Sequence, residues 1–285
     1  MISDPRSLLE LEFPAFEFSW TEQHCQLYAL ATGFGQDPVD ERELRYVIEG
    51  PDLRVSPTVA VTLYWDYRWM EASGVNLALS LHGEQRNVFH RPIPPTGRGR
   101  VVSCITGVFD KGPGRGLVVE CTQVVHDVAS GEPVATNVIY NFARADGGIG
   151  YSSGPAPKPH LLPDRAPDAA MPGTTRPEQA LLYRQLGDRN PLHADPATAR
   201  AAGFERPILH GMCTYGFAAR AVLATACDYD PGRLASIGAR ISAPVYPGDT
   251  LRTEVWRDGD VVSFRTLVPE RGNVVVLNNG RAELR

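Results

Sequence analysis

The sequence predicts an α+β protein built from two similar units, each a helical segment followed by antiparallel strands. Tyr28 in YALATGFGQD parallels Tyr183 in YRQLGDRNP at an offset of about 155 residues, and Pro95 parallels Pro247 at about 152. Two nearly equal offsets favour a duplicated unit of about 150 residues over the short period of a solenoid. Chance similarity between turns rich in proline and glycine is the alternative explanation.

The first predicted unit covers residues 1–144. Its later part, GRVVSCITGVFDKGPGRGLVVECTQVVHDVASGEPVATNVIYNFA, contains β-rich runs with turn signals at 111–116 and 129–133. The earlier stretch 56–80, SPTVAVTLYWDYRWMEASGVNLALS, is ambiguous. Strands that follow a helix in this way are expected to wrap around it.

A stretch rich in proline and glycine, residues 145–175, is predicted to be a linker that continues neither helix nor strand. The second unit then covers residues 176–285. Its final runs, LRTEVWRDGDVVSFRTLVPERGNVVVLNNGRAEL, include Asp-Gly within 257–260, which predicts a β-hairpin.

The run YRQLGDRNPLHADP carries the strongest functional signal. Because Pro191 disfavours helical backbone at Asn190, the segment is predicted to be a turn. On a turn, Asp188 and His193 can converge on one water molecule, as an acid/base pair must. The simpler interpretation is that Asp188 and Asn190 only close the turn while His193 caps the next helix.

Two helices are predicted after this turn. Asp195 and Pro196 form a start signal for a short helix over 196–202, and Gly203 is a plausible stop. A second, apolar helix begins near Gly211, where backbone N–H groups without partners and the macrodipole would stabilise an oxyanion. Close packing in a tight turn is the alternative role for Gly211, and His210 is read as a packed or surface histidine.

The run GDRNPLHADPATARAAGFERPILHGMCTYGFAAR resembles the signature of the MaoC-like, R-specific enoyl-CoA hydratases, the type 2 enoyl-CoA hydratases, including the hydratase unit of peroxisomal multifunctional enzymes. LHGEQ at 81–85, FDKGPG at 109–114 and APVYPGDTL at 243–251 resemble further family segments in the same order. The resemblance extends from about Tyr28 to the C-terminus.

The resemblance implies a double hot-dog fold, in which each unit is a long helix wrapped by an antiparallel sheet. It also implies reversible hydration of trans-2-enoyl-CoA to (R)-3-hydroxyacyl-CoA. Asp188 and His193 would share the water, Asn190 would orient it, and the N–H of Gly211 would stabilise the enolate. The first unit lacks a counterpart of this pair, so we expect it to accommodate medium or longer, bulky acyl groups.

Substrate contacts follow from the same resemblance. His82, Gly83 and Lys111 are expected near the CoA thioester, with Lys111 a suitable partner for phosphate or pantetheine groups. A solvated turn lysine is the alternative for Lys111. Ile241 stands where the family pattern has a larger aromatic residue, which leaves the shape of the acyl pocket open.

Composition limits the partners. The 285 residues are 43% hydrophobic with a formal net charge of -5 and no run of Lys or Arg, which argues against nucleic-acid binding. No apolar stretch approaches membrane-spanning length, and five scattered cysteines indicate a reducing compartment. We expect a cytoplasmic homodimer that acts on acyl-CoA without a cofactor, a metal or a membrane.

Three other functions stay open. A hot-dog thioesterase would use a carboxylate-activated water but does not need the Asp-x-Asn-Pro-x-His run. A metal hydrolase is disfavoured because Asp188 and His193 lack a third ligand at recognisable spacing. A non-catalytic acyl-thioester-binding subunit of a dehydratase is the best alternative from another class, although the intact pair argues against it.

Overall fold

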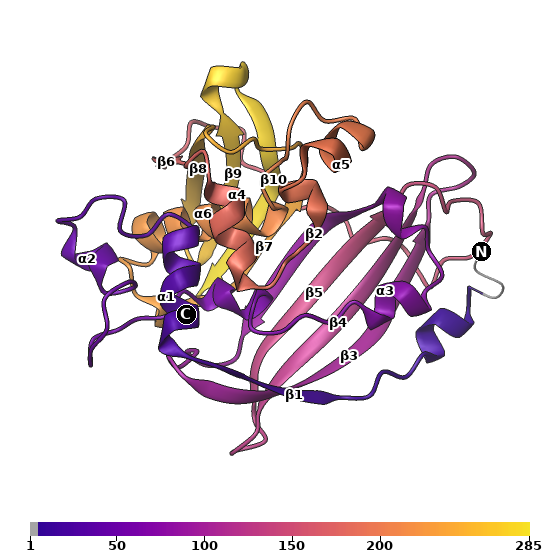
Figure 1. Ribbon diagram of the computed structural model, residues 1–285, viewed down its shortest axis with the longest axis horizontal. Helices are drawn as coiled ribbons and strands as arrows, with labels where there is room; N and C mark the ends of the chain where they lie inside the picture. The colour runs from indigo at the N-terminus through magenta and orange to yellow at the C-terminus, as the bar shows by residue number, and fades with distance from the viewer. Residues whose placement is uncertain (1–4) are drawn as a thin grey trace.

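The computed structural model describes residues 5–285 (Figure 1). The helices are α1 (Glu22–Ala31), α2 (Glu41–Leu44), α3 (Arg68–Ala72), α4 (Gln179–Tyr183), α5 (Pro196–Ala201) and α6 (Gly211–Ala226). The strands are β1 (Phe16–Trp20), β2 (Ser80–Phe89), β3 (Gly97–Asp110), β4 (Leu117–Asp127), β5 (Pro133–Ala143), β6 (Ala169–Thr174), β7 (Leu234–Ile241), β8 (Thr250–Asp258), β9 (Val261–Val268) and β10 (Val274–Leu284).

One antiparallel sheet of ten strands runs through both halves, in the order β1-β3-β4-β5-β2-β7-β10-β9-β8-β6. Read from its edge inward, the first half has the order β1-β3-β4-β5-β2, and the second half has the order β6-β8-β9-β10-β7. Each half therefore places its own first, third, fourth, fifth and second strands in the same sequence, and the two halves share one topology. They join where β2 pairs with β7, with Glu84 opposite Arg240 and Val88 opposite Ser236. This symmetry is what a duplicated unit predicts.

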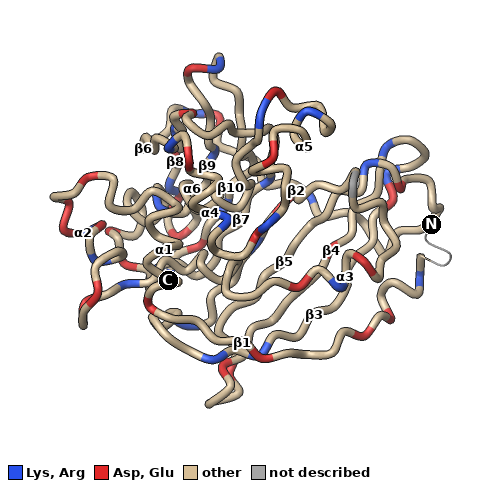
Figure 2. The backbone as a smooth tube through the Cα atoms, in the orientation of Figure 1, with Lys and Arg blue, Asp and Glu red and all other residues tan. Residues whose placement is uncertain are grey.

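The second half has a long central helix. Thirteen of the sixteen residues of α6 are buried, and the helix contacts strands β6 to β10. A helix buried on all sides must be apolar all round. Arg220 is its single charged residue, and Figure 2 shows Lys and Arg elsewhere interspersed with Asp and Glu.

The long helix expected in the first half is not found among the described residues. The described helices of this half are short, and the ambiguous stretch 56–80 folds as a 3-10 turn (Pro57–Val61), the five-residue α3 and a second 3-10 turn (Leu77–Leu79). Figure 1 shows this purple segment crossing the face of β5, β4 and β3. Irregular backbone therefore covers the sheet here, where α6 does so in the second half.

The prediction that residues 145–175 form a linker without helix or strand is wrong at its C-terminal end, because Ala169–Thr174 form β6 and pair with β8. Strand β6 lies at the edge of the sheet, where Pro172 is tolerated because one side of the strand needs no ladder hydrogen bonds. Other local predictions are confirmed. Strands β8 and β9 form the hairpin around 257–260, and helix α5 ends before Gly203, whose φ is +89°.

Candidate active site

The predicted turn between α4 and α5 is confirmed. Gly187 has a φ of 119°, and Asn190 is extended with a ψ of 122° before the 3-10 turn Pro191–His193. The carboxylate of Asp188 accepts a hydrogen bond from the N–H of Asn190 at 3.1 Å, and the Asn190 side chain accepts one from Leu192 at 3.0 Å. Asp188 and Asn190 thus do close the turn. Asp195, rather than His193, caps α5.

His193 is held in one orientation by the backbone. Its Nδ1 lies 2.8 Å from the carbonyl oxygen of Ile208. A carbonyl can only accept, so Nδ1 carries the proton and Nε2 is left as an acceptor. Burial lowers the pKa of His193 below its ordinary value, which keeps the ring neutral near pH 7. A neutral imidazole with a free Nε2 is what a general base requires.

His210 completes the cluster. The expectation of a packed histidine is confirmed, but no pattern in the sequence indicates its contact with His193. Its ring stacks on His193 at 3.8 Å between centroids and lies 4.9 Å from the ring of Tyr183. Its Nε2 lies 3.4 Å from the backbone oxygen of Asp188. The residue is 1% exposed, and burial lowers the pKa of His210 to about 2. It stays neutral and supports the plane of His193.

Asp188, His193 and His210 place one ligand atom each within 4.8 Å of one another. This separation lets one water contact both members of the Asp188–His193 pair. The cluster also supplies the third potential metal ligand that spacing alone does not reveal. However, Nδ1 of His193 lies against the carbonyl of Ile208, and the two imidazole rings are stacked 29° from parallel, whereas the ligands of a tetrahedral ion approach it from well-separated directions. The arrangement suits an acid/base pair better than a metal.

Helix α6 begins at Gly211, as predicted, and His210 makes no side-chain cap there. The N–H groups of Cys213 and Thr214 donate to the carbonyl of His210, whereas those of Gly211 and Met212 have no backbone acceptor among the described contacts and are available to an oxyanion. A Cβ built on Gly211 would lie 2.6 Å from Cδ1 of Ile241. Glycine thus lets the backbone approach Ile241 closely, and Ile241 lies at the helix N-terminus.

The structure brings three of the four predicted substrate contacts together. Glu84 of β2 pairs with Arg240 of β7, and Gly83 and Ile241 are the next residues at the same end of this pairing. The neighbouring His82 has a pKa that burial lowers to about 4, and its Nε2 has no partner among residues 5–285. Lys111 lies apart, in the turn between β3 and β4, with β4 and β5 between its strand and β2.

The first half also reaches the turn that carries Asp188 and His193, through residues that the sequence analysis did not single out. The indole Nε1–H of Trp65 donates to the carbonyl of Leu186 at 2.9 Å, and its ring fills the space beside Gly187. Tyr67 stacks on Trp65 at 5.8 Å between centroids. Burial and then the negative charge of Asp188 raise the pKa of Tyr67. In the sequence, the aromatic run YWDYRW was the feature that pointed to these contacts.

Comparison with known proteins identifies both halves. Residues 18–145 match the family model described as MFE-2 hydratase 2 N-terminal domain, and residues 160–279 match MaoC like domain. The chain is 40% identical over 276 residues to an enoyl-CoA hydratase of Mycobacterium tuberculosis, covering 95% of each chain. The chain belongs to the MaoC-like type 2 enoyl-CoA hydratase family.

Solved structures agree with this family. A MaoC-like dehydratase from Phytophthora capsici superposes with a TM-score of 0.87 at 28% identity, covering 99% of both chains. A Mycobacterium tuberculosis protein described as a double hotdog fold superposes with a TM-score of 0.58 at 17% identity, covering 97% of both chains, which supports the fold alone. The protein described by residues 5–285 therefore has the double hot-dog fold. No helix within residues 5–285 is long and apolar enough to span a membrane.

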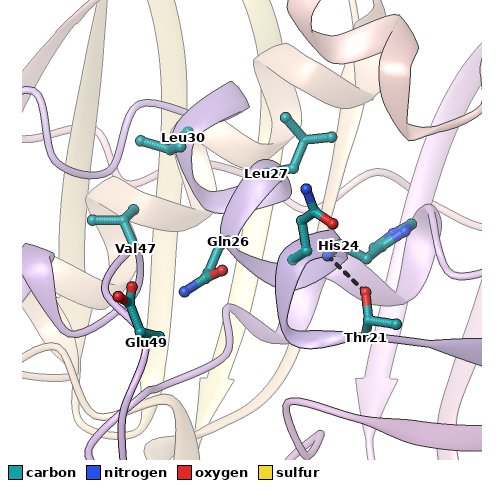
Figure 3. A pocket seen from close by; sticks show the side chains of 8 residues that line it. Thr21, His24, Gln26, Leu27, Leu30, Val47 and Glu49 are labelled. Atoms are coloured by element: carbon teal, nitrogen blue, oxygen red, sulfur yellow. Dashed lines mark hydrogen bonds between the residues drawn. The ribbon is translucent and has the colours of Figure 1, made fainter.

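A pocket of about 440 Å³ lies beside α1, and none of its lining residues belongs to the turn 187–193 (Figure 3). In Figure 3, Glu49 and His24 lie at opposite sides of this pocket, so they do not form an acid/base pair. It is lined by Thr21, Gln23, His24, Gln26, Leu27, Leu30, Val47 and Glu49.

Proposed function

We propose that the protein catalyses the reversible hydration of trans-2-enoyl-CoA to (R)-3-hydroxyacyl-CoA. The observation that carries the proposal is the orientation of His193, whose Nδ1 is held by Ile208 while the ring lies beside Asp188. Family membership by itself supports the general reaction, which is hydration of an enoyl-CoA. The roles of single residues rest on the geometry.

In the hydration direction, one water lies between the Asp188 carboxylate and Nε2 of His193. Nε2 accepts one proton of the water while Asp188 accepts a hydrogen bond from its other O–H. The resulting hydroxide adds to the β-carbon, and electrons of the double bond move onto the thioester oxygen as an enolate. The pair then returns the proton to the α-carbon, so the elements of one water are added.

The N–H of Gly211 donates to the enolate oxygen. The loss of one such donor costs about 3–4 kcal/mol of transition-state stabilisation in enzymes that use one. Asn190 acts indirectly, because its side chain fixes the turn through Leu192. His210 is a positioning residue that packs against His193.

The test replaces each member of the pair. Asp188→Asn keeps an oxygen for the Asn190 N–H and removes the charge, and His193→Ala removes the base. We expect each to lower kcat by about 100-fold or more, and the double variant to lose little more than either single one. Asp195→Asn, a nearby carboxylate change that preserves helix capping, is the matched control and should stay active.

Loss of enoyl-thioester absorbance follows the reaction, chiral analysis identifies the product, and circular dichroism checks folding. A folded single variant with near-normal turnover would refute the assignment of the pair. An S product would refute the stereochemistry, and release of free CoA thiol instead of hydration would identify a thioesterase. A homodimer in the cytoplasm stays a prediction, which light scattering and cell fractionation would test.

A further inference from the structure

A β-bulge at Gly83 turns the side chain of His82 towards the inner face of the sheet, which is the face that the segment 56–80 and α6 cover. On β2, Glu84 lies on the outer face and forms ion pairs with Arg86 and Arg240. Strict alternation along the strand would place His82 on that outer face as well. The register between β2 and β5 shifts between His82 and Glu84, so the extra residue Gly83 re-aims His82. Bulges that re-aim a side chain are frequent beside active sites.

Asn141 of β5 is the cross-strand partner of His82 and lies on the inner face. Asn141 pairs with His82 on one side and with the buried Val119 of β4 on the other. Two positions earlier on β5, Ile139 packs against the buried apolar residues of the inner face, so alternation places Asn141 there too. Asn141 is 2% exposed. The bulge therefore brings an imidazole and a buried amide side by side.

Each of these two side chains has a buried polar atom without a partner among residues 5–285. The atoms are Nε2 of His82 and Nδ2 of Asn141. Burial lowers the pKa of His82 to about 4, while hydrogen bonds from the ring to Gln85 and to the backbone of Glu84 raise it. These bonds use Nδ1, because Nε2 has no partner, so the neutral ring carries its proton on Nδ1 and can accept at Nε2. Buried polar groups are as a rule paired, which indicates a ligand that offers one donor and one acceptor.

The pair lies near the N-terminus of α6. Ile241, which follows the last residue of β7 that pairs with β2, lies against Gly211. Neighbouring strands are about 4.8 Å apart, so β2 and β5 place His82 and Asn141 roughly 10 Å from Gly211. In a CoA ester whose thioester oxygen is bound at Gly211, the first pantetheine amide follows the sulfur after two methylene groups. That amide is the hydrogen-bonding group of the arm that falls within reach of the pair.

The chain segment that leads into the pair exposes apolar side chains. Leu77, Leu79 and Leu81 are 46%, 42% and 39% exposed, and Leu81 directly precedes His82. Apolar surface beside an unpaired polar pair matches an arm in which amides alternate with methylene groups. Lys111 follows β3 at the same end of the sheet. The pair thus lies between the oxyanion site and a cation suited to phosphate, which is the order of groups along CoA.

We propose that His82 and Asn141 bind the first amide of the pantetheine arm. Nδ2 of Asn141 donates to the amide carbonyl, and Nε2 of His82 accepts from the amide N–H. An amide offers one acceptor and one donor, which is the complement of this pair. The proposal rests on the proposed function and makes Asn141 a substrate-binding residue. Because a site built to hydrogen-bond a substrate group rejects analogues without that group, the pair selects against plain alkyl thioesters.

The experiment compares two crotonyl thioesters in the full-length protein. Crotonyl N-acetylcysteamine contains the first amide, and S-pentyl thiocrotonate replaces it with methylene groups of the same chain length. We expect kcat/KM to be at least about tenfold higher for the amide ester. In His82→Asn and in Asn141→Leu, this ratio should fall towards unity, mainly through a higher KM for the amide ester. His82→Asn retains a polar atom for Gln85 and removes the one at Nε2, and Asn141→Leu removes the donor at similar size.

His126→Asn is the matched control for His82→Asn. His126 lies towards the other end of β4 from Val119, and its Nδ1 lies 3.1 Å from the carbonyl oxygen of Gly131. The ratio should not change in this variant. Ligand-observed NMR titration with butanoyl N-acetylcysteamine and S-pentyl thiobutanoate measures the same preference without turnover, because these saturated esters cannot be hydrated. Circular dichroism checks that each variant folds.

The inference is overturned if the unmodified protein binds and hydrates the two esters equally well. It is also overturned if the folded variants lose activity to the same extent with both esters, because that result identifies a structural role. If the amide ester binds preferentially and the variants remove this preference, but neither crotonyl ester is hydrated, the proposed function fails while the amide site holds.

Discussion

A buried ion pair fastens the first half of the chain to the central helix of the second. The carboxylate of Glu43, on α2, accepts hydrogen bonds from Arg220 Nε at 2.8 Å, from Tyr229 at 3.2 Å and from the N–H of Gly35 at 2.9 Å. The Arg220 and Glu43 side chains are 7% and 2% exposed. Glu43→Gln keeps the shape of the side chain and leaves the guanidinium buried without its counter-charge.

The expected cost follows from this burial. Removal of one partner of a buried pair destabilises proteins by about 3–5 kcal/mol. In a chain of this size that corresponds to a Tm lower by about 6–20 °C. The ion pair between Arg98 and Glu17 has a similar N–O distance of 2.9 Å, but its side chains are 69% and 50% exposed. Glu17→Gln is therefore the control and should cost less than about 1 kcal/mol.

Urea unfolding followed by circular dichroism measures both variants. The double variant Glu43→Leu/Arg220→Met should lose less stability than the sum of its single variants, because neither charge is then buried alone. If Glu43→Gln costs no more than the Glu17→Gln control, the reasoning about this pair is refuted.

Two further predictions concern acid and CoA binding. Burial lowers the pKa of His82 to about 4 and of His210 to about 2, so below pH 6.5 the unfolded chain binds protons that the folded chain does not. Stability is therefore complete above pH 6.5 and falls with acid by up to about 1.4 kcal/mol per pH unit for each histidine. Urea unfolding at pH 7 and pH 5 should show a smaller loss in His210→Asn, and an equal loss would contradict this. Lys111→Ala should raise KM for CoA esters more than it lowers kcat; an effect on kcat alone would argue against a binding role.

Sequence alone determined the features that depend on neighbouring residues. Asp195 and Pro196 predict the start of α5, and the structure has Asp195 accepting from two N–H groups of its first turn. The start of α6 at Gly211 and the hairpin at 257–260 are local in the same sense. The turn around Pro191 follows from the restriction that proline imposes on Asn190.

Tertiary structure decided the rest, because it depends on contacts between distant segments. His210, the residue before α6, stacks on His193 only in the folded chain, and no spacing in the sequence signals the stack. Residues 169–174 become a strand because β8 offers an edge to pair with, which overrides their proline and glycine content. The indole of Trp65 donates to the carbonyl of Leu186 across 121 positions of the chain, and no local pattern in the sequence specifies a contact over that separation.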